Sequence, residues 1–279
     1  MIRRIGLVLI GLLFLSISNA YADTVQCTVS MGRKAFDASD DAKSWNEYYA
    51  NYKNYAACDD GAIAEGFSDS VAQLFAKHWD NIEQFIELSN KDEDFKYFAL
   101  SHIDETDDYN DLQRIATNTK KACPGGQAPL CKAIWAQASY PDVMGLLSLF
   151  AHKQKTKESP QRIYYPENND LIAGRLVNDH KDDVVVAYTL EGIRGGTDWL
   201  RYLAVYLQSD DKDDPEHRYC CSVQIGGKGV AEVDSISIKN HEILVSGKAF
   251  IEDKDAMNTP SKPMQLKFKI KDGKLIEAD

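Results

Sequence analysis

The spacing of hydrophobic residues changes once along the chain, and this change predicts two halves of different secondary structure. In the first half, apolar side chains recur at the three- and four-residue intervals of an amphipathic helix. Two stripes show this spacing: Trp45, Tyr48, Tyr49, Tyr52 and Tyr55, then Ile63, Phe67, Val71, Leu74, Phe75 and Trp79. Further helices are expected at 94–103, 110–122, 130–139 and 142–152. The aromatic stripe is more typical of a helical core than of an interface.

In the second half the period falls to two, which is the pattern of β-strands. Leu266, Phe268 and Ile270 alternate with lysines, and the following Asp-Gly pair is typical of a tight hairpin turn. Two segments are apolar on both faces, as expected of central strands: 183–190 and 199–207. Edge strands are expected around them at 219–225, 230–238 and 242–250.

The order of these elements predicts the fold class. Helices come first and strands follow, so the fold class is α+β rather than an alternation of strands and helices. We expect an N-terminal disulfide-stapled helical bundle at 23–155 and a mostly antiparallel β domain at 160–279. The polar segment between them, which ends in Pro160, is expected to be a linker.

Residues 1–22 have the composition of a secretory signal peptide. Arg3 and Arg4 precede an apolar run, and Ala20-Tyr21-Ala22 matches a small-x-small cleavage site. The apolar run would be roughly 20 Å long as a helix, too short for a hydrocarbon core of about 30 Å. We therefore expect cleavage after Ala22, a soluble exported protein and no membrane span afterwards. Because the leader looks bacterial, the expected compartment is the periplasm.

The six cysteines all follow the predicted leader, and export favours disulfide bonds among them. Sequence order favours two pairs, Cys27–Cys58 and Cys123–Cys131, which would contribute roughly 3.5 and 2.5 kcal/mol to stability in the loop-entropy model. The last two, Cys220 and Cys221, are adjacent. They could bond to each other, pair elsewhere, or pack as thiols beside the sheet.

The charge of the chain restricts its partners. With 32 basic and 43 acidic residues the formal net charge is −11, which argues against nucleic acid because phosphate binding needs a basic surface. Most acidic clusters are solvated faces, but one could attract a basic protein, such as an envelope enzyme or toxin, beside a tyrosine of the type enriched at interfaces. The candidate partner-binding residues in that cluster are Asp104, Glu105, Asp107, Asp108 and Tyr109.

No catalytic, metal or cofactor motif stands out in the sequence. The histidines are scattered, and G-x-S-x-G and H-E-x-x-H are absent. Residues 174–186 resemble the calcium hairpin of FG-GAP repeats, with Asp179 and Asp183 at the third and last ligand positions. Arg175 and Val177 replace the first two ligands, so the resemblance implies a loop followed by a strand and no bound calcium. No cofactor is expected.

Two further resemblances bear on the class of protein. The segment from Asn51 to Ala56 and the one from Ile63 to Phe67 resemble the helical immunity proteins that neutralise type VI amidase effectors. Those proteins are exported and disulfide-containing, and they plug the cleft of a peptidoglycan amidase. In the second half, the glycines at 192–196 and 226–229 stand in segments that resemble β domains of uncharacterised bacterial secreted proteins, which implies no activity.

These observations favour a non-enzymatic periplasmic binding protein, such as an inhibitor or immunity factor for a secreted or envelope enzyme. Two other classes stay open. An envelope hydrolase could use a pair of carboxyl groups brought together by folding, and a structural or adhesion-like module could use the β half as a platform.

Overall fold

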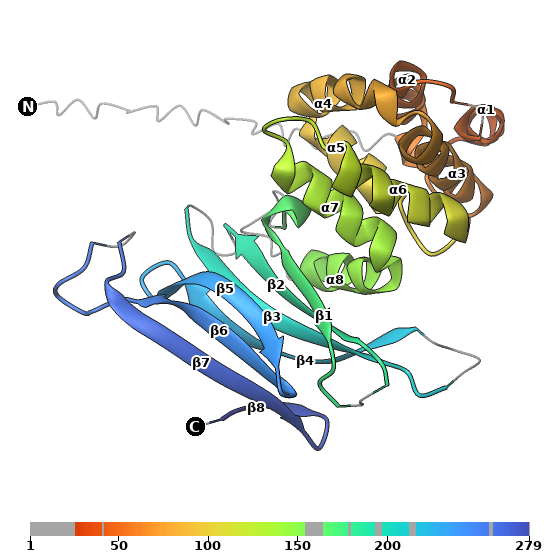
Figure 1. Ribbon diagram of the computed structural model, residues 1–279. Coiled ribbons are helices and arrows are strands. Elements are labelled where there is room, and N and C mark those ends of the chain that lie inside the picture. The colour runs from red at the N-terminus through yellow and green to blue at the C-terminus, as the bar shows by residue number, and fades with distance from the viewer. Residues whose placement is uncertain are drawn as a thin grey trace, which may run out of the picture.

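The chain is an α+β protein, and in the part that the structure describes eight α-helices precede eight antiparallel strands (Figure 1). The structure, a computed structural model, describes residues 26–40, 42–153, 164–177, 180–192, 197–211, 216–256 and 259–278. The predicted signal peptide and most of the predicted linker lie outside these residues. The helices end at Lys153 and the first strand begins at Asp170, so the change of structure falls where the change of period predicts it.

The helices form one compact group in the upper part of Figure 1. They are α1 (Val29–Ser39), α2 (Trp45–Tyr55), α3 (Ala62–Lys77), α4 (Ile82–Lys91), α5 (Glu93–Ser101), α6 (Tyr109–Lys121), α7 (Ala128–Ser139) and α8 (Pro141–Lys153). Side-chain caps at Thr28, Ser44, Asp92 and Asp108 accept the backbone N–H groups that open four of them. Helix α1 lies within the predicted helical bundle but before the first predicted helical stripe, which begins at Trp45. It buries only Ala35 and Ser39 and exposes Val29 and Phe36, so it has no apolar stripe for the sequence pattern to reveal.

Aromatic rings fill the core of the helical group. Trp45 and Tyr48 are fully buried, and the Trp45 ring lies 4.6 Å from the rings of both Phe75 and Phe85. Tyr49, Tyr52 and Tyr55 pack against the same core at its margin. The interpretation of the aromatic stripe as core is therefore confirmed for its first two members, and the other three are partly exposed.

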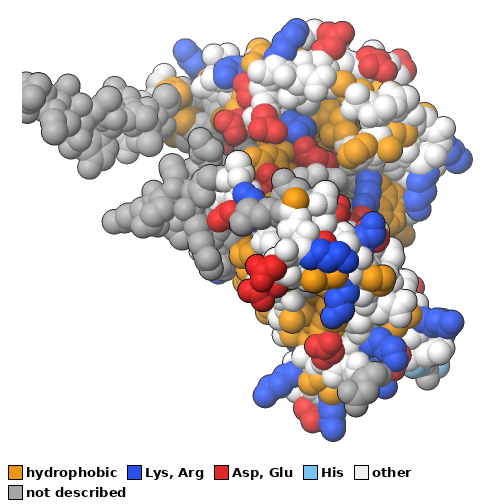
Figure 2. Space-filling model, turned by 90° about the vertical axis from the view of Figure 1, so that its left-hand side faces the viewer, with side chains coloured by type: hydrophobic (Ala, Val, Ile, Leu, Met, Phe, Trp, Pro, Cys, Tyr) orange, Lys and Arg blue, Asp and Glu red, His pale blue; other side chains and the backbone are white. Residues whose placement is uncertain are grey.

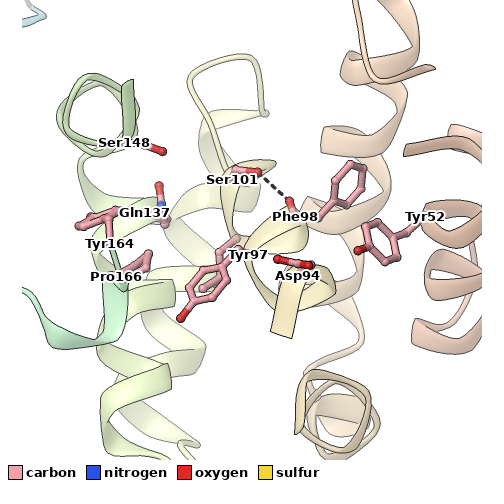
Figure 3. A pocket seen from close by; sticks show the side chains of 10 residues that line it. Tyr52, Asp94, Tyr97, Phe98, Ser101, Gln137, Ser148, Tyr164 and Pro166 are labelled. Carbon is pink, nitrogen blue, oxygen red and sulfur yellow. Dashed lines mark hydrogen bonds between the residues drawn. The ribbon is translucent and has the colours of Figure 1, made fainter. Parts of the chain in front are cut away.

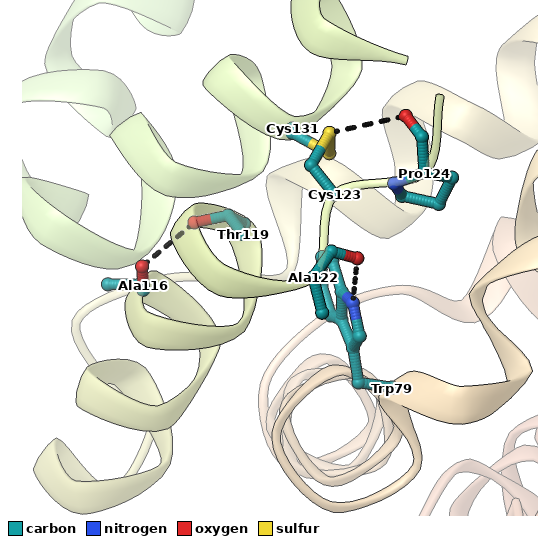
Figure 4. Close-up of a disulfide and its surroundings, with 7 residues drawn as sticks. All are labelled: Trp79, Ala116, Thr119, Ala122, Cys123, Pro124 and Cys131. Atoms are coloured by element: carbon teal, nitrogen blue, oxygen red, sulfur yellow. Dashed lines mark hydrogen bonds between the residues drawn. A yellow bond between two sulfur atoms is a disulfide. The ribbon is translucent and has the colours of Figure 1, made fainter. Parts of the chain in front are cut away.

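Two disulfides close the loops of this group, in the pairing that sequence order predicts. Cys27–Cys58 ties the chain before α1 to the turn before α3. Cys123–Cys131 bridges the α6–α7 connection (Figure 4). Beside it, Trp79 donates its indole N–H to the carbonyl of Ala122 at 2.9 Å. The covalent bond and the hydrogen bond together fix the end of α6 against the rest of the bundle.

The strands follow one another in chain order, each antiparallel to the next. They are β1 (Asp170–Gly174), β2 (Asp183–Glu191), β3 (Trp199–Gln208), β4 (His217–Gly227), β5 (Ala231–Lys239), β6 (Glu242–Ala249), β7 (Lys262–Lys271) and β8 (Lys274–Glu277). The prediction of edge strands was wrong for β4, β5 and β6, which all have neighbours on both sides. The edges of the sheet are β1 and β8. Both are short, and short strands give a weak period-two signal.

The sheet folds over on itself between β4 and β5, which pair only through Gly227 and Ala231. Strands β1–β4 and β5–β8 therefore form two layers that enclose a common apolar core, to which β2 contributes Val185 and Ala187. The alternate residues of β2, among them Val184 and Val186, pack on the other face against α8. The result is three layers, with helices, then β1–β4, then β5–β8 (Figure 1).

Charged pairs join the helices to the middle layer. Lys96 of α5 pairs with Glu167 at 2.5 Å, and Lys132 of α7 and Arg201 of β3 share the carboxylate of Asp170. At the start of α8, the carboxylate of Asp142 accepts the backbone N–H of His217 at 2.7 Å and contacts its ring nitrogen at 2.9 Å.

The Asp142–His217 pair shifts both pKa values. Burial alone would lower the pKa of His217, but the hydrogen bond to Asp142 and its negative charge outweigh burial and raise it above the usual value. Burial alone would raise the pKa of Asp142, but the hydrogen bonds from His217 lower it. The His217 contribution to stability is present below about pH 6.5 and is lost as the pH rises through its folded pKa. The Asp142 contribution is present above about pH 4 and is lost on further acidification.

We expect His217→Gln to reduce the free energy of unfolding more at about pH 5.5 than at about pH 9, by roughly 1–2 kcal/mol. The measurement is urea unfolding of both proteins at each pH. His78→Gln serves as control, because it makes the same substitution at an exposed histidine at the end of α3. An equal effect of His217→Gln at the two pH values would contradict a charged Asp142–His217 pair.

Candidate functional site

The residues predicted to bind a partner lie together in the loop between α5 and α6 and in the first residue of α6. Glu105 and Asp108 are exposed, and Tyr109 is 71% exposed, a high value for an aromatic side chain. Asp104 is half-buried, and Asp107 is buried at 7% exposure. The structure thus divides the predicted set: three members lie on the surface, and two turn toward the bundle.

The inward members hold the loop in place. Asp104 accepts a hydrogen bond from the Ser68 hydroxyl of α3 at 2.9 Å and two more from Thr106. The carboxylate of Asp107 accepts the backbone N–H of Asp104 at 3.1 Å. Asp108 accepts the N–H groups of Asn110 and Asp111 and so caps α6. A loop fixed by this many bonds loses little conformational entropy when it binds.

His102 adds a connection that the sequence did not reveal. Its Nδ1 lies 2.8 Å from the carbonyl oxygen of Phe98, and its Nε2 lies 3.0 Å from a carboxylate oxygen of Asp59. Both neighbours of the ring are acceptor oxygens. Because Asp59 lies 43 residues before His102, in the turn before α3, only folding brings the two together.

The environment of Asp107 keeps its carboxyl group neutral at neutral pH. Burial, together with the nearby carboxylates of Asp104, Asp69 and Asp111, raises the pKa of Asp107 to about 8, although the hydrogen bond from the Asp104 N–H lowers it. One carboxyl oxygen of Asp107 has no hydrogen-bond partner among the described residues, and neither has the buried hydroxyl of Tyr48. Burial and the charges of Asp59, Asp107 and Asp104 raise the pKa of Tyr48. These groups mark a polar region inside the helical core.

A pocket of about 410 Å³ lies beside α5 (Figure 3). The side chains in its wall come from α2, α5, α7, α8 and the segment before β1: Tyr52, Asp94, Tyr97, Phe98, Leu100, Ser101, Gln137, Ser148, Tyr164 and Pro166. Its volume is within the range of small-ligand sites. Aromatic rings next to one carboxylate suit a positively charged group, which is attracted both to ring faces and to the negative charge. Sequence reasoning missed this pocket because its walls come from five separate segments.

The pocket and the loop adjoin along the chain. Ser101 ends α5 at the pocket wall, and Glu105 follows four residues later on the loop. One partner could therefore contact both.

The remaining predicted groups are not arranged for chemistry. Cys220 and Cys221 are thiols on β4, at a bulge opposite Val205 and Tyr206. Burial, together with the neighbouring Cys220 thiol, raises the pKa of Cys221 to about 12, so that thiol stays protonated and unreactive.

In the FG-GAP-like segment, the carboxylate of Asp183 binds backbone N–H groups. Asp183 accepts the N–H groups of Leu176, Val177 and Gln208, which occupies both of its oxygens. The segment does form a loop followed by a strand, and Asp183 closes that loop. Asp179 lies outside the described residues.

A search of the described residues found no group of three or more metal-ligating side chains, and no helix there is long and apolar enough to cross a membrane. No protein-family model matches the chain, and no curated protein or solved structure is significantly similar to it. The function must therefore be inferred from the geometry of these surfaces.

The raised pKa of Asp107 predicts a specific effect of pH on stability. An acid whose pKa is raised by folding costs stability above its unfolded pKa, so the folded state is penalised progressively between about pH 4 and pH 8. Asp107→Asn keeps an acceptor for the Asp104 N–H and removes the charge. We expect the free energy of unfolding of Asp107→Asn, measured relative to that of the natural protein, to rise by at least about 2 kcal/mol between pH 5 and pH 9.

Denaturant unfolding at the two pH values measures this gain. Asp108→Asn makes the same chemical change one residue later at an exposed position, and asparagine retains the helix cap. It should show no comparable gain. If the Asp107→Asn difference is the same at both pH values, Asp107 is ionised throughout and the assignment is wrong.

Proposed function

We propose that this chain is an exported, non-enzymatic binding protein that acts on a basic protein partner, as an inhibitor or immunity factor for a secreted or envelope enzyme. The proposed contact surface is the α5–α6 loop with the first residue of α6. Its outward residues are Glu105, Asp108 and Tyr109.

The observation that carries the proposal is the exposure of Tyr109 on a fixed acidic loop. A single exposed tyrosine is common on protein surfaces and indicates no function by itself. Tyr109, however, lies beside two surface carboxylates, on a loop that is hydrogen-bonded to α3 through Asp104 and Ser68. Tyrosines are enriched among the residues that dominate binding energy, and charges around them speed the encounter with a partner of opposite sign.

The pocket beside α5 supports a basic partner as well. Its rings already attract cations of this chain, because Lys53 lies over the ring of Tyr52 at 5.6 Å and Lys96 over the ring of Tyr97 at 4.7 Å. The helical half as a whole is acidic, with 14 basic and 22 acidic residues over 23–158. Its field favours approach of a cationic protein from this side.

One observation favours the alternative of an envelope hydrolase. Asp107, with a pKa raised to about 8, lies next to the carboxylate of Asp104, and paired carboxyl groups of different pKa can serve as acid and base. However, Asp107 is buried, and neither residue is among those that line the described pockets. Peptidoglycan zymography tests this alternative, and clearing that disappears in Asp107→Asn would favour it over the binding proposal.

The binding proposal predicts that Glu105→Gln, Asp108→Asn and Tyr109→Ala together abolish capture of a basic protein from a periplasmic extract at low salt. The loss should exceed tenfold, because two rim charges and one aromatic anchor are removed. The capture is read by quantitative mass spectrometry, with non-reducing buffers that preserve both disulfides.

A matched control removes equal charge elsewhere. Glu83→Gln and Glu87→Gln change two exposed carboxylates on α4, and this protein should capture the same partner as the natural one. High salt should weaken both complexes. If the triple variant retains every protein that the natural chain retains, the α5–α6 loop is not the contact surface.

A further inference from the structure

The outermost layer of the molecule carries a face of opposite charge to the rest of the chain. In β6–β8 side chains alternate between two directions, and β5 does the same on either side of a bulge at Asp234. The inward set, which includes Ile243, Val245 and Phe268, packs in the core between the two sheet layers. The outward set lies on the far side of the molecule from the helices.

Lysines dominate that outward set. The strand registers place six lysines and two glutamates in it: Lys239, Lys248, Lys267, Lys269, Lys271, Lys274, Glu232 and Glu242. We call these positions the lysine face. Asp234, at the bulge of β5, is exposed as well and has no register partner. Every one of the six lysines is exposed. In a chain with a net charge of −11, this local excess of positive charge is a distinct feature.

The densest part of the lysine face is on β7 and β8. Lys267, Lys269 and Lys271 occupy every second position of β7, about 7 Å apart, and Lys274 pairs with Lys271 across the hairpin. Glu242 offsets part of this charge through an ion pair with Lys269 at 2.8 Å. That hydrogen bond, with the charges of Lys269 and Lys267, lowers the pKa of Glu242. The carboxylate of Glu242 is therefore held in its charged form by the lysines beside it.

Apolar side chains interrupt the lysines. Ile276 is 40% exposed opposite Lys269, and Leu244 is half-buried opposite Lys267. Figure 2 shows lysine and arginine side chains with hydrophobic ones between them in the lower half of the view, where β5–β8 lie. Basic side chains around apolar ones are the combination that binds the headgroup region of a bilayer.

We propose that the lysine face is a peripheral docking surface for an anionic lipid bilayer. Phosphate headgroups would lie against Lys267, Lys269, Lys271 and Lys274, and Ile276 would contact the boundary between headgroups and acyl chains. The surface is an open sheet face rather than a cleft, which suits an extended planar partner better than a discrete ligand. Because β5–β8 form the layer farthest from the helices, docking would leave the α5–α6 loop accessible. The inference does not depend on the proposed function.

The test is co-sedimentation of the protein from Asp23 onward with phosphatidylcholine vesicles, with and without roughly 30% phosphatidylglycerol. This form retains every described residue and omits the apolar leader, which would bind lipid on its own account. We expect binding only to the anionic vesicles at about 0.05 M NaCl, and its loss at about 0.5 M NaCl. Lys267→Gln, Lys271→Gln and Lys274→Gln together should weaken binding about a hundredfold, at roughly fivefold per lysine.

The control carries three identical changes on the helices. Lys34→Gln, Lys91→Gln and Lys121→Gln give the same net charge and should bind anionic vesicles like the natural protein, and circular dichroism should show both variants folded. Equal binding to neutral and anionic vesicles, or an unchanged affinity of the β7–β8 variant, would overturn the proposal. Binding to heparin without binding to anionic vesicles would also overturn it, in favour of a soluble polyanion.

Discussion

The rest of the structure depends on β2 and β3 being buried on both faces. Alternate side chains of β2 point to opposite sides, and both sets are apolar, so water can reach neither side of this strand. One side is covered by α8 and the other by the layer of β5–β8. The sheet must fold over after β4 to supply the second cover, and the helices must dock to supply the first. The three-layer arrangement follows from the composition of these two strands.

Burial of the middle layer also determines where charge can lie. Ionisable groups near it are hydrogen-bonded or paired, as Asp183 is with three backbone N–H groups, Asp142 with His217 and Asp170 with Arg201. Exposed charge of one predominant sign collects instead on two outer surfaces, which are the carboxylates around Tyr109 on the helical side and the lysine face on the opposite side. A single net charge of −11 conceals this separation, because it averages over surfaces that never meet a common partner.

The sequence predicts those features that depend on neighbours along the chain, and it fails where distant segments meet. The fold class, the helices with apolar stripes and the two disulfides all follow from local spacing. Helix α1 has no such stripe. The places of β4, β5 and β6 inside the sheet, each with a neighbour on both sides, depend on how the sheet folds over. The five candidate partner-binding residues are contiguous, but the division between outward Tyr109 and inward Asp107 depends on α3, which supplies Ser68. The contact between His102 and Asp59 has the same origin.

The inward turn of Asp107 explains how an acidic loop can be rigid. Four closely spaced carboxylates would repel one another and open the loop if all were ionised. Burial raises the pKa of Asp107 to about 8 and so removes one negative charge at neutral pH, while its backbone acceptor function is retained. Asp104 is then stabilised by Ser68 and Thr106, and Asp108 by the N-terminus of α6. The protonated carboxyl group of Asp107 therefore helps to fix the loop that carries the surface carboxylates, and it adds no negative charge of its own.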